Sequence, residues 1–271
     1  MQKRVRWALC AALVLVLAGS VFYLVRHEME NRRRAQEYAD AQERAFASSL
    51  PVSTPAPSPT PPPEPTPEPD PWALELALTD LDALREVNPE VVGWVRIPET
   101  DLSYPLMYSG DNAYYLSHTW TGEPNAGGAI FLEQGCAPDF CDFNIIIYGH
   151  SMTDTSMFGT LRLYTDREFW REHPRVYLVD DDWVYCFDIF SVYEANVRDL
   201  TYGLSITREE DKRYYANYCA DRASYPTGIT PTGEAPVLTM STCIDMGQSD
   251  FRWVVQGVLA EKYPAGDRKT G

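Results

Sequence analysis

The chain of 271 residues is long enough for one domain of up to about 200 residues with extensions, and a hydrophobic content of 45% permits a real core. The net charge of −16 is unevenly placed, because residues 1–71 carry eight basic and eight acidic side chains and the remainder carries 15 basic and 31 acidic ones. An acidic globule argues against nucleic acid as the partner, since neutralising phosphates requires basic surface.

The N-terminal region has the pattern of a membrane anchor. Residues 1–6 form a short basic head, and residues 7–25 are nineteen residues without a charge. This length is about that of a helix that spans a bilayer, and it exceeds the apolar region of most signal peptides, about 7–15 residues. The small residues of "LAGS" leave a cleaved signal peptide as the alternative, but the length favours an uncleaved transmembrane segment.

Two further segments separate this anchor from the rest of the chain. Residues 26–50 are polar and rich in Ala, Glu and Arg, which predicts a juxtamembrane helix, and residues 51–71 contain eleven prolines. Such a proline-rich linker favours extended polyproline II and reaches roughly 60 Å. Basic residues flank both sides of the apolar stretch, so the positive-inside rule leaves its orientation open. The stalk favours a cytoplasmic N-terminus and an extracellular domain over residues 72–271.

The domain from residue 72 onwards reads as mainly β. A helix is predicted over 79–88, capped by Thr79 or Asp80 and ended by Asn88-Pro89. Two more helices are predicted over 166–173 and 207–223, the latter opening with a capping box of Thr207 and Glu210. Short runs rich in Val, Ile, Tyr, Phe and Trp predict strands at 91–97, 103–109, 127–134, 144–151, 175–180, 183–197, 236–242 and 251–263. Seven or eight short strands with few helices indicate a closed or nearly closed β-barrel.

Most of the cysteines and histidines have ordinary explanations. Cys186 alternates with core positions and Cys219 lies within a predicted helix, so both are expected to be small buried apolar residues. Cys136 and Cys141 share one loop, and they form either a disulfide, as an extracellular domain allows, or a free pair. No spacing of Cys and His indicates zinc, so neither a metal site nor a cofactor is expected. His150 ends a strand, where a histidine is more often a structural hydrogen-bonding group than a catalyst.

The stretch "VLTMSTCIDMGQSDFRWVV" places a thiol at the end of one predicted strand and a guanidinium nine residues later, at the start of the next. A cysteine attacks a carbonyl as the thiolate, so it needs a proton acceptor or a nearby cation. No helix is predicted behind Cys243 to supply a dipole. An imidazole and a permanent positive charge can take its place, and His150 and Arg252 supply these groups from the ends of their own strands.

Three separated motifs resemble the sortases, membrane-anchored cysteine transpeptidases of Gram-positive bacteria. They are "NIIIYGHSM" with "SMFGTL", then "LTMSTC", then "FRWVV", in that order. The resemblance covers most of residues 75–263. The opening "NPEVVGWVRIPETDLSYPLMYSGDNAYYLSHTW", the run "GGAIFLEQ" and the insertion with a helix at 207–223 are similar to the class B branch.

The resemblance implies a sortase β-barrel with Cys243 as nucleophile, His150 as general acid and base, and Arg252 as the ligand of the oxyanion. It also implies substrate contacts at Ser241 and Thr242. The implied partners are C-terminal sorting-signal peptides of secreted proteins, NPxTN-like in class B, and an amine from a peptidoglycan precursor or a pilin lysine. The family pattern TLxTC has Met240 in place of Leu, a swap that keeps the side-chain volume.

Two other functions remain as alternatives. A wall hydrolase of the Cys/His type normally carries its cysteine on a helix ahead of the histidine, whereas here His150 precedes a cysteine that ends a strand. A membrane-tethered scaffold on a degenerate sortase barrel would not need its reactive residues. The substitution Cys243→Ala distinguishes an enzyme from a scaffold, because an enzyme would lose turnover whereas a scaffold would keep its function.

Overall fold

The computed structural model describes residues 2–47, 70–243 and 250–266 of the chain. The chain divides into two compact units, Met1–Asp40 and Ala41–Gly271. The proline-rich linker predicted over 51–71 lies outside the described residues up to residue 69.

A single helix, α1 (Gln2–Phe46), contains both the apolar stretch and the polar segment that follows it. Within Ala12–Phe46, an 18-residue window has a mean hydropathy of 1.5. The helix is therefore long and apolar enough to cross a membrane, which is compatible with an anchor. The polar half is supported by ion pairs one turn apart, Arg26–Glu30 at 3.0 Å and Glu28–Arg32 at 2.8 Å. Each such pair stabilises a helix by about 0.3–0.5 kcal/mol.

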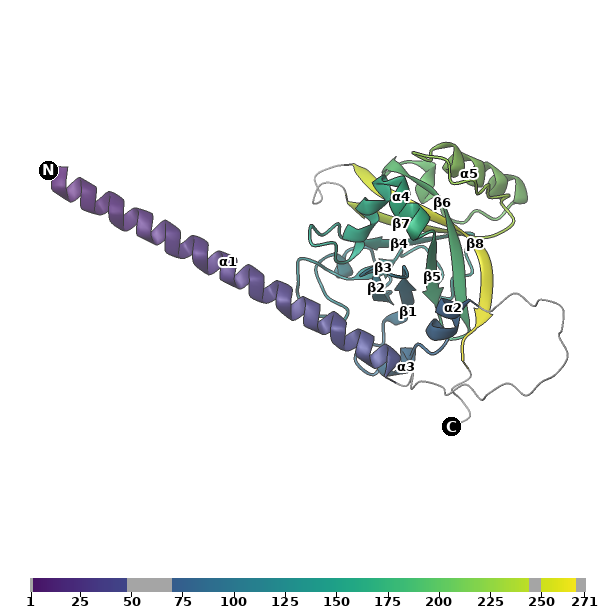
Figure 1. Cartoon of the computed structure of the whole chain (residues 1–271), viewed down its shortest axis with the longest axis horizontal. Helices are drawn as coiled ribbons and strands as arrows, with labels where there is room; N and C mark the ends of the chain where they lie inside the picture. The colour runs from purple at the N-terminus through teal and green to yellow at the C-terminus, as the bar shows by residue number, and fades with distance from the viewer. Residues whose placement is uncertain (1, 48–69, 244–249, 267–271) are drawn as a thin grey trace. The chain divides into compact units, whose positions relative to one another are not determined.

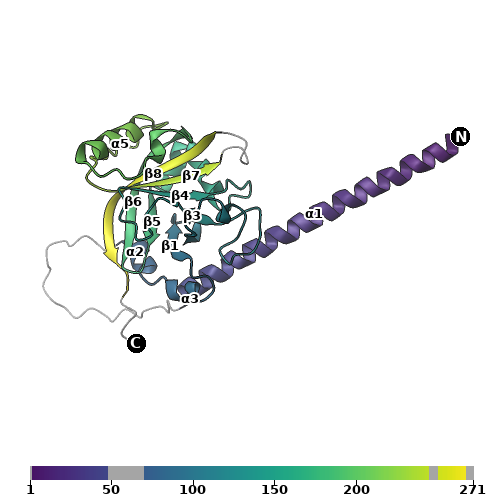
Figure 2. The same ribbon diagram turned by 180° about the vertical axis from the view of Figure 1, so that it is seen from behind.

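The second unit is a closed barrel of eight strands, which confirms the predicted fold class (Figures 1 and 2). The strands are β1 (Val91–Arg96), β2 (Ser103–Met107), β3 (Ile130–Leu132), β4 (Asn144–Gly149), β5 (Arg175–Val179), β6 (Trp183–Asn196), β7 (Val237–Cys243) and β8 (Phe251–Pro264). Their order around the barrel is β1-β2-β3-β4-β7-β8-β6-β5. Each of the eight runs read from the sequence overlaps one of these strands, with bounds that differ by a few residues.

The barrel closes where β1 pairs antiparallel with β5, in the register Trp94↔Val179. Gly93 sits at this closure beside an irregularity in the β1–β2 pairing. A Cβ atom there would lie 2.4 Å from the carbonyl oxygen of Val179, so any larger residue would force the two strands apart. The close approach of the backbones is the reason for a glycine inside this strand.

The core fills the barrel with large side chains. Trp94, Phe131 and Phe187 are all less than 3% exposed, and the run Ile145–Ile147 of β4 is buried at every position. A continuous apolar run, instead of an alternating one, fits a strand covered on both faces. Full burial of each such side chain contributes about 1.5–3 kcal/mol.

The short helices cap the barrel. They are α2 (Pro71–Leu76), α3 (Leu81–Arg85), α4 (Arg167–Glu172) and α5 (Glu209–Asp221), with the 3₁₀ turns η1 (Tyr114–Leu116), η2 (Phe158–Thr165) and η3 (Leu200–Tyr202). Figures 1 and 2 show α5 at one end of the barrel and α2 with α3 at the other. Of the two caps considered for α3, the structure uses Asp80, whose carboxylate accepts from the Ala83 N–H at 3.0 Å.

The predicted capping box of the helix at 207–223 is wrong. Helix α5 begins at Glu209 with Arg208 as the N-cap residue, and no side chain caps it by a hydrogen bond. Arg208 instead pairs with Asp211 at 2.8 Å. The first turn contains three acidic residues, whose negative charges interact favourably with the positive end of the helix dipole. This interaction stabilises the N-terminus of the helix in place of a side-chain cap.

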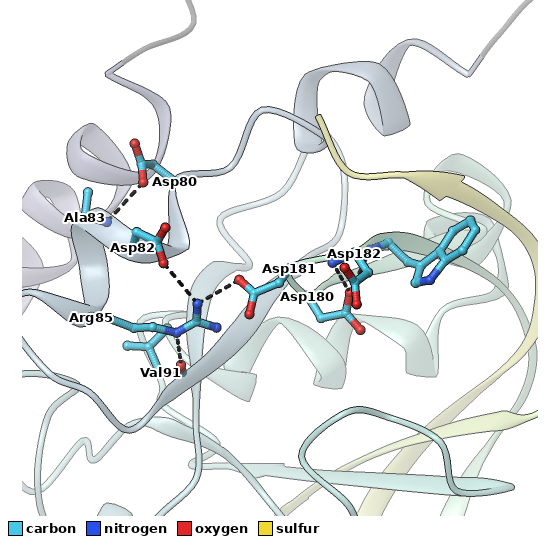
Figure 3. Close-up of polar contacts among 9 residues, drawn as sticks. Asp80, Asp82, Ala83, Arg85, Val91, Asp180, Asp181 and Asp182 are labelled. Atoms are coloured by element: carbon cyan, nitrogen blue, oxygen red, sulfur yellow. Dashed lines mark hydrogen bonds and ion pairs between the residues drawn. The ribbon is translucent and has the colours of Figure 1, made fainter. Parts of the chain in front are cut away.

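Arg85 of α3 fastens this helix to the barrel (Figure 3). Its Nε donates to the Val91 carbonyl at 2.9 Å, and its Nη1 lies 2.7 Å from Asp181 in the β5–β6 turn and 3.3 Å from Asp82. One guanidinium therefore joins α3, β1 and the turn between β5 and β6.

Candidate active site

The predicted catalytic residues come from strands that are neighbours in the barrel. Strands β4 and β7 are parallel, with Gly149 opposite Thr242, so both strands end at the same edge. Strand β8 is antiparallel to β7 and begins at that edge, with Arg252 opposite Cys243. His150 directly follows Gly149. The topology therefore brings the backbones of Cys243, His150 and Arg252 to one edge, although they span more than 100 positions of sequence.

A groove of about 570 Å³ opens at this edge. Four of the five predicted site residues line it, namely His150, Arg252, Ser241 and Thr242. The side chain of Cys243 lies outside the described part of the structure, while its backbone ends β7. The remaining lining residues are Asn112, Leu116, Phe131, Glu133, Tyr148, Gly149, Val197, Tyr202 and Leu204.

His150 is half-buried and fixed in orientation. Its Nε2 lies 2.8 Å from the carbonyl oxygen of Leu116. A carbonyl only accepts, so Nε2 carries a proton and Nδ1 is the nitrogen that can exchange one. The preceding Gly149 packs on Phe158, where a Cβ atom would lie 2.9 Å from the ring. The end of β4 is therefore held tightly just before the imidazole.

Arg252 is half-buried at the start of β8, and its Nη1 donates to the carbonyl of Phe251 at 2.9 Å. Its backbone lies between Cys243 of β7 and Ala195 of β6. An arginine keeps its charge at any physiological pH and offers several donors, so this position suits the binding of a carbonyl oxygen that gains negative charge.

Aromatic side chains form one wall of the groove. The hydroxyls of Tyr202 and Ser241 are 2.9 Å apart, so the Ser241 side chain supports this wall. Tyr148 stacks on Tyr202 with ring centroids 6.4 Å apart and packs against Phe131 at 5.5 Å. Burial, with the nearby charge of Glu133, raises the pKa of Tyr148 well above its ordinary value, so its hydroxyl stays protonated.

Several lining residues were missed in the sequence. Tyr148 stands two residues before His150 within "NIIIYGH", and Glu133 is an acidic residue directly after the apolar run "AIFL". A polar group at the end of a buried strand is a usable signal in both cases. Asn112 and Tyr202 lie outside the strands, where no periodicity marks them.

The other described cysteines do not line this groove. Cys136 and Cys141, whose pairing the sequence left open, are both free thiols, and Cys186 and Cys219 are buried as predicted. Burial raises the pKa of Cys136 and of Cys186 to about 12. Cys141 is exposed, and a hydrogen bond with Asp139 raises its pKa. These groups stay protonated and are therefore poor nucleophiles at neutral pH.

A second cavity, of about 580 Å³, shares no lining residue with the groove. Three of its polar side chains already have partners, because Arg175 lies 3.1 Å from Asp70 and 2.9 Å from Asp188, and the Nδ1 of His173 lies 3.1 Å from the Pro98 carbonyl. Across the described ranges no group of three or more His, Cys, Asp and Glu side chains is arranged to hold a metal ion. The groove at the ends of β4 and β7 is the better candidate for chemistry.

Comparison with known proteins identifies the class. The model of the Sortase domain family matches residues 95–260. Sortase B of Listeria monocytogenes is 33% identical over 184 residues, covering 68% of this chain and 75% of that protein. The chain therefore belongs to the sortase family.

Within this family the relatives place the chain in class B. The X-ray structure of Clostridium perfringens sortase B superposes with a TM-score of 0.62 at 26% identity, covering 67% of this chain and 100% of that one. The crystal structure of sortase B from B. anthracis in complex with AAEK1 superposes with a TM-score of 0.66 at 25% identity, covering 86% and 99% of the two chains.

Proposed function

We propose that the protein cleaves a C-terminal sorting signal of secreted proteins, NPxTN-like or related, and joins the new acyl end to an amine. In this proposal Cys243 is the nucleophile, His150 the general acid and base, and Arg252 the ligand of the oxyanion. The observation that supports it most is the register of β4, β7 and β8, because it assembles these three residue types at one edge beside a groove.

The first half of the reaction forms a thioacyl-enzyme. The Cys243 thiolate attacks the carbonyl carbon of the scissile peptide bond, and the carbonyl oxygen becomes an oxyanion that the Arg252 guanidinium stabilises. As the C–N bond breaks, the His150 imidazolium gives its Nδ1 proton to the leaving amine. The Nε2–H stays on the Leu116 carbonyl in both charge states of the ring, so the imidazole keeps its orientation.

The second half transfers the acyl group. An amine attacks the thioester, His150 takes a proton from it, and the Cys243 thiolate leaves. The acceptor is an amine of a cell-wall precursor or a pilin lysine. Ser241 and Thr242 support the substrate from the groove wall that they line.

The proposed location is the outer face of the cell membrane. Residues 7–25 would cross the bilayer as part of α1, with the basic head, residues 1–6, in the cytoplasm. Residues 26–50 and the linker over 51–71 would then carry the catalytic domain, residues 72–271, away from the membrane surface. Replacing the proline-rich linker by a short Gly/Ser segment should impair attachment of substrates in cells while peptide cleavage in vitro is unchanged. Normal attachment would contradict the role of the linker as a spacer.

The test is product analysis by mass spectrometry. The purified full chain in detergent is incubated with a library of NPxTN-type peptides and with amines such as triglycine. We expect a peptide cut after Thr and joined to the amine. The product should be absent with Cys243→Ala and present with the matched variant Cys141→Ala, which removes an exposed thiol outside the groove.

Other outcomes separate the alternatives. Cleavage without joining, under every amine tried, would favour a hydrolase. Products that persist in Cys243→Ala would refute the proposed nucleophile. A normal function in cells with Cys243→Ala would favour a scaffold.

A further inference from the structure

Glu133 follows β3 and is a buried carboxylate in the wall of the groove, with 8% of its surface exposed. A buried acidic group is retained where it is hydrogen-bonded, and its partners indicate its role. Glu133 has no role in the reaction proposed above, but its hydrogen-bond partner Asn112 lies four positions before Leu116, whose carbonyl contacts His150.

Asn112 holds the Glu133 carboxylate on both oxygens. Its Nδ2 lies 2.7 Å from Oε1 and 2.8 Å from Oε2, and the N–H of Gly135 donates to Oε1 at 3.3 Å. The amide of Asn112 is held from its other side as well, because its Oδ1 accepts from the Gln134 N–H at 2.9 Å. We call this pair of side chains the Glu133–Asn112 clasp. It joins the end of β3 to a segment 21 residues away in sequence.

The segment that the clasp holds leads directly into η1. Asp111, beside Asn112, accepts from the N–H groups of Ala113 and Tyr114 at 2.6 and 2.8 Å, which starts the turn. The turn ends at Leu116, and the carbonyl of Leu116 is the group that lies 2.8 Å from Nε2 of His150. The carbonyl that orients the imidazole therefore belongs to the residue four positions after Asn112.

A separate contact anchors the middle of η1. Tyr115 is fully buried, and its hydroxyl accepts from the Nδ2 of Asn88 at 3.1 Å. Loss of the clasp therefore leaves the turn attached to the core. What the clasp adds is restraint at the N-terminal end of the turn, so that the Leu116 carbonyl keeps its direction towards His150.

We propose that Glu133 and Asn112 are positioning residues, which hold η1 so that the Leu116 carbonyl keeps His150 in the Nε2–H tautomer with Nδ1 available for proton transfer. The proposal rests on the proposed function for its kinetic consequence, but the tautomer is a property of the resting protein. Charge-assisted hydrogen bonds in a buried setting are suited to this role because they are short and directional.

The test uses three variants of the full chain in detergent. Asn112→Leu removes the clasp with a side chain of similar size, and Glu133→Gln keeps an acceptor for Asn112 while removing the charge. Asn125→Leu is the matched control, because the Asn125 Oδ1 accepts from the Gly127 N–H within its own loop at 2.8 Å. Nitrogen-15 NMR of labelled histidine side chains reads the tautomer, and the His150 signal is assigned by its loss in His150→Gln.

We expect the wild-type His150 to show the Nε2–H tautomer and Asn112→Leu to show a mixture of tautomers. The kcat should fall by about 10- to 100-fold in Asn112→Leu, since small misplacements of a catalytic group cost up to about 100-fold. Glu133→Gln should lie between this variant and the wild type, and Asn125→Leu should behave as the wild type in both measurements.

Three results would overturn the proposal. They are a wild-type Nδ1–H tautomer, an unchanged His150 signal and kcat in Asn112→Leu, and a rise of KM at constant kcat, which would make these residues substrate contacts. If the wild type turns over no peptide, the proposed function fails, and the NMR comparison still decides the positioning role.

Discussion

Gln256 of β8 is fully buried, and its side-chain amide has three hydrogen bonds. The Oε1 accepts from the hydroxyl of Tyr193 at 3.0 Å, and the Nε2 donates to the hydroxyl of Tyr215 at 3.1 Å and to Oγ1 of Thr239 at 2.9 Å. These partners belong to β6, α5 and β7, so one amide joins the insertion helix to the strand that ends at Cys243. Gln256→Leu keeps the size of the side chain and removes all three bonds.

The expected cost follows from counting these bonds. Each partner keeps a further hydrogen bond, to Thr201 or Asn144, so none is left fully unpaired by the substitution. The full penalty of an orphaned buried group therefore does not apply, and the net value of about 1 kcal/mol per hydrogen bond does. Three bonds predict a loss of about 3 kcal/mol in the free energy of unfolding, with an unchanged denaturant m-value.

The assay is urea unfolding of the full chain in detergent, followed by tryptophan fluorescence. Of the seven tryptophans, only Trp7 lies in α1, so the signal reports the barrel unit. The control is the same substitution at Gln42, whose amide donates to the Ser103 carbonyl at 3.1 Å, and there we expect about 1 kcal/mol. A loss in Gln256→Leu no larger than that in Gln42→Leu would refute the idea that the buried network stabilises the barrel.

Three further predictions concern charge and thiol chemistry. Arg252→Lys keeps a positive charge but loses the planar set of donors, so kcat/KM with the best peptide should fall by about 100-fold, whereas wild-type kinetics would remove Arg252 from the reaction. Iodoacetamide at pH 7 should modify Cys243 before Cys136 and Cys186, because burial raises the pKa values of the latter two thiols to about 12. The experiment uses Cys141→Ala, which removes the exposed thiol that would compete for the reagent. Equal rates of modification, measured by peptide mass spectrometry, would contradict this prediction. The Cys136 thiol stays protonated up to about pH 12 in the folded chain, whereas it loses its proton near pH 9.0 in the unfolded chain. The contribution of this thiol to the free energy of unfolding is therefore complete below pH 9. Above pH 9 it is lost by up to about 1.4 kcal/mol per pH unit. The urea midpoint should therefore fall between pH 9 and 11, and Cys136→Ala should make that fall shallower, whereas the same slope in both proteins would count against it.

The strands were predictable because their signal is local. Runs such as "VVGWVRI" and "NIIIYGH" combine β-branched and aromatic residues with clear boundaries, and each of these two runs contains a strand of the barrel. The start of α5 was not predictable in the same way. Thr207 and Glu210 fit a capping box in the sequence, but the structure begins the helix at Glu209 and uses acidic residues at the dipole instead.

The candidate site likewise contains residues that local sequence predicts and residues whose contacts depend on the fold. Cys243, His150 and Arg252 could be proposed because each is a reactive type at the end of a strand, and the barrel order then places the three strand ends together. Glu133 and Asn112 could not be paired beforehand, because their contact joins the end of β3 to a segment outside the strands. Tyr202 reaches Ser241 across 39 residues of sequence. Contacts of this kind follow from the register of the barrel and not from any local pattern.

The central claim is that Cys243 forms a thioacyl bond with a sorting-signal peptide, and intact-protein mass spectrometry of the peptide reaction without added amine tests it most directly. We expect a mass increase equal to the N-terminal fragment of the cleaved peptide, located by digestion on the segment that contains Cys243. The adduct should be removed by hydroxylamine, absent from Cys243→Ala and present in Cys141→Ala. Peptide cleavage that continues in Cys243→Ala, or an adduct on a different cysteine, would contradict the account.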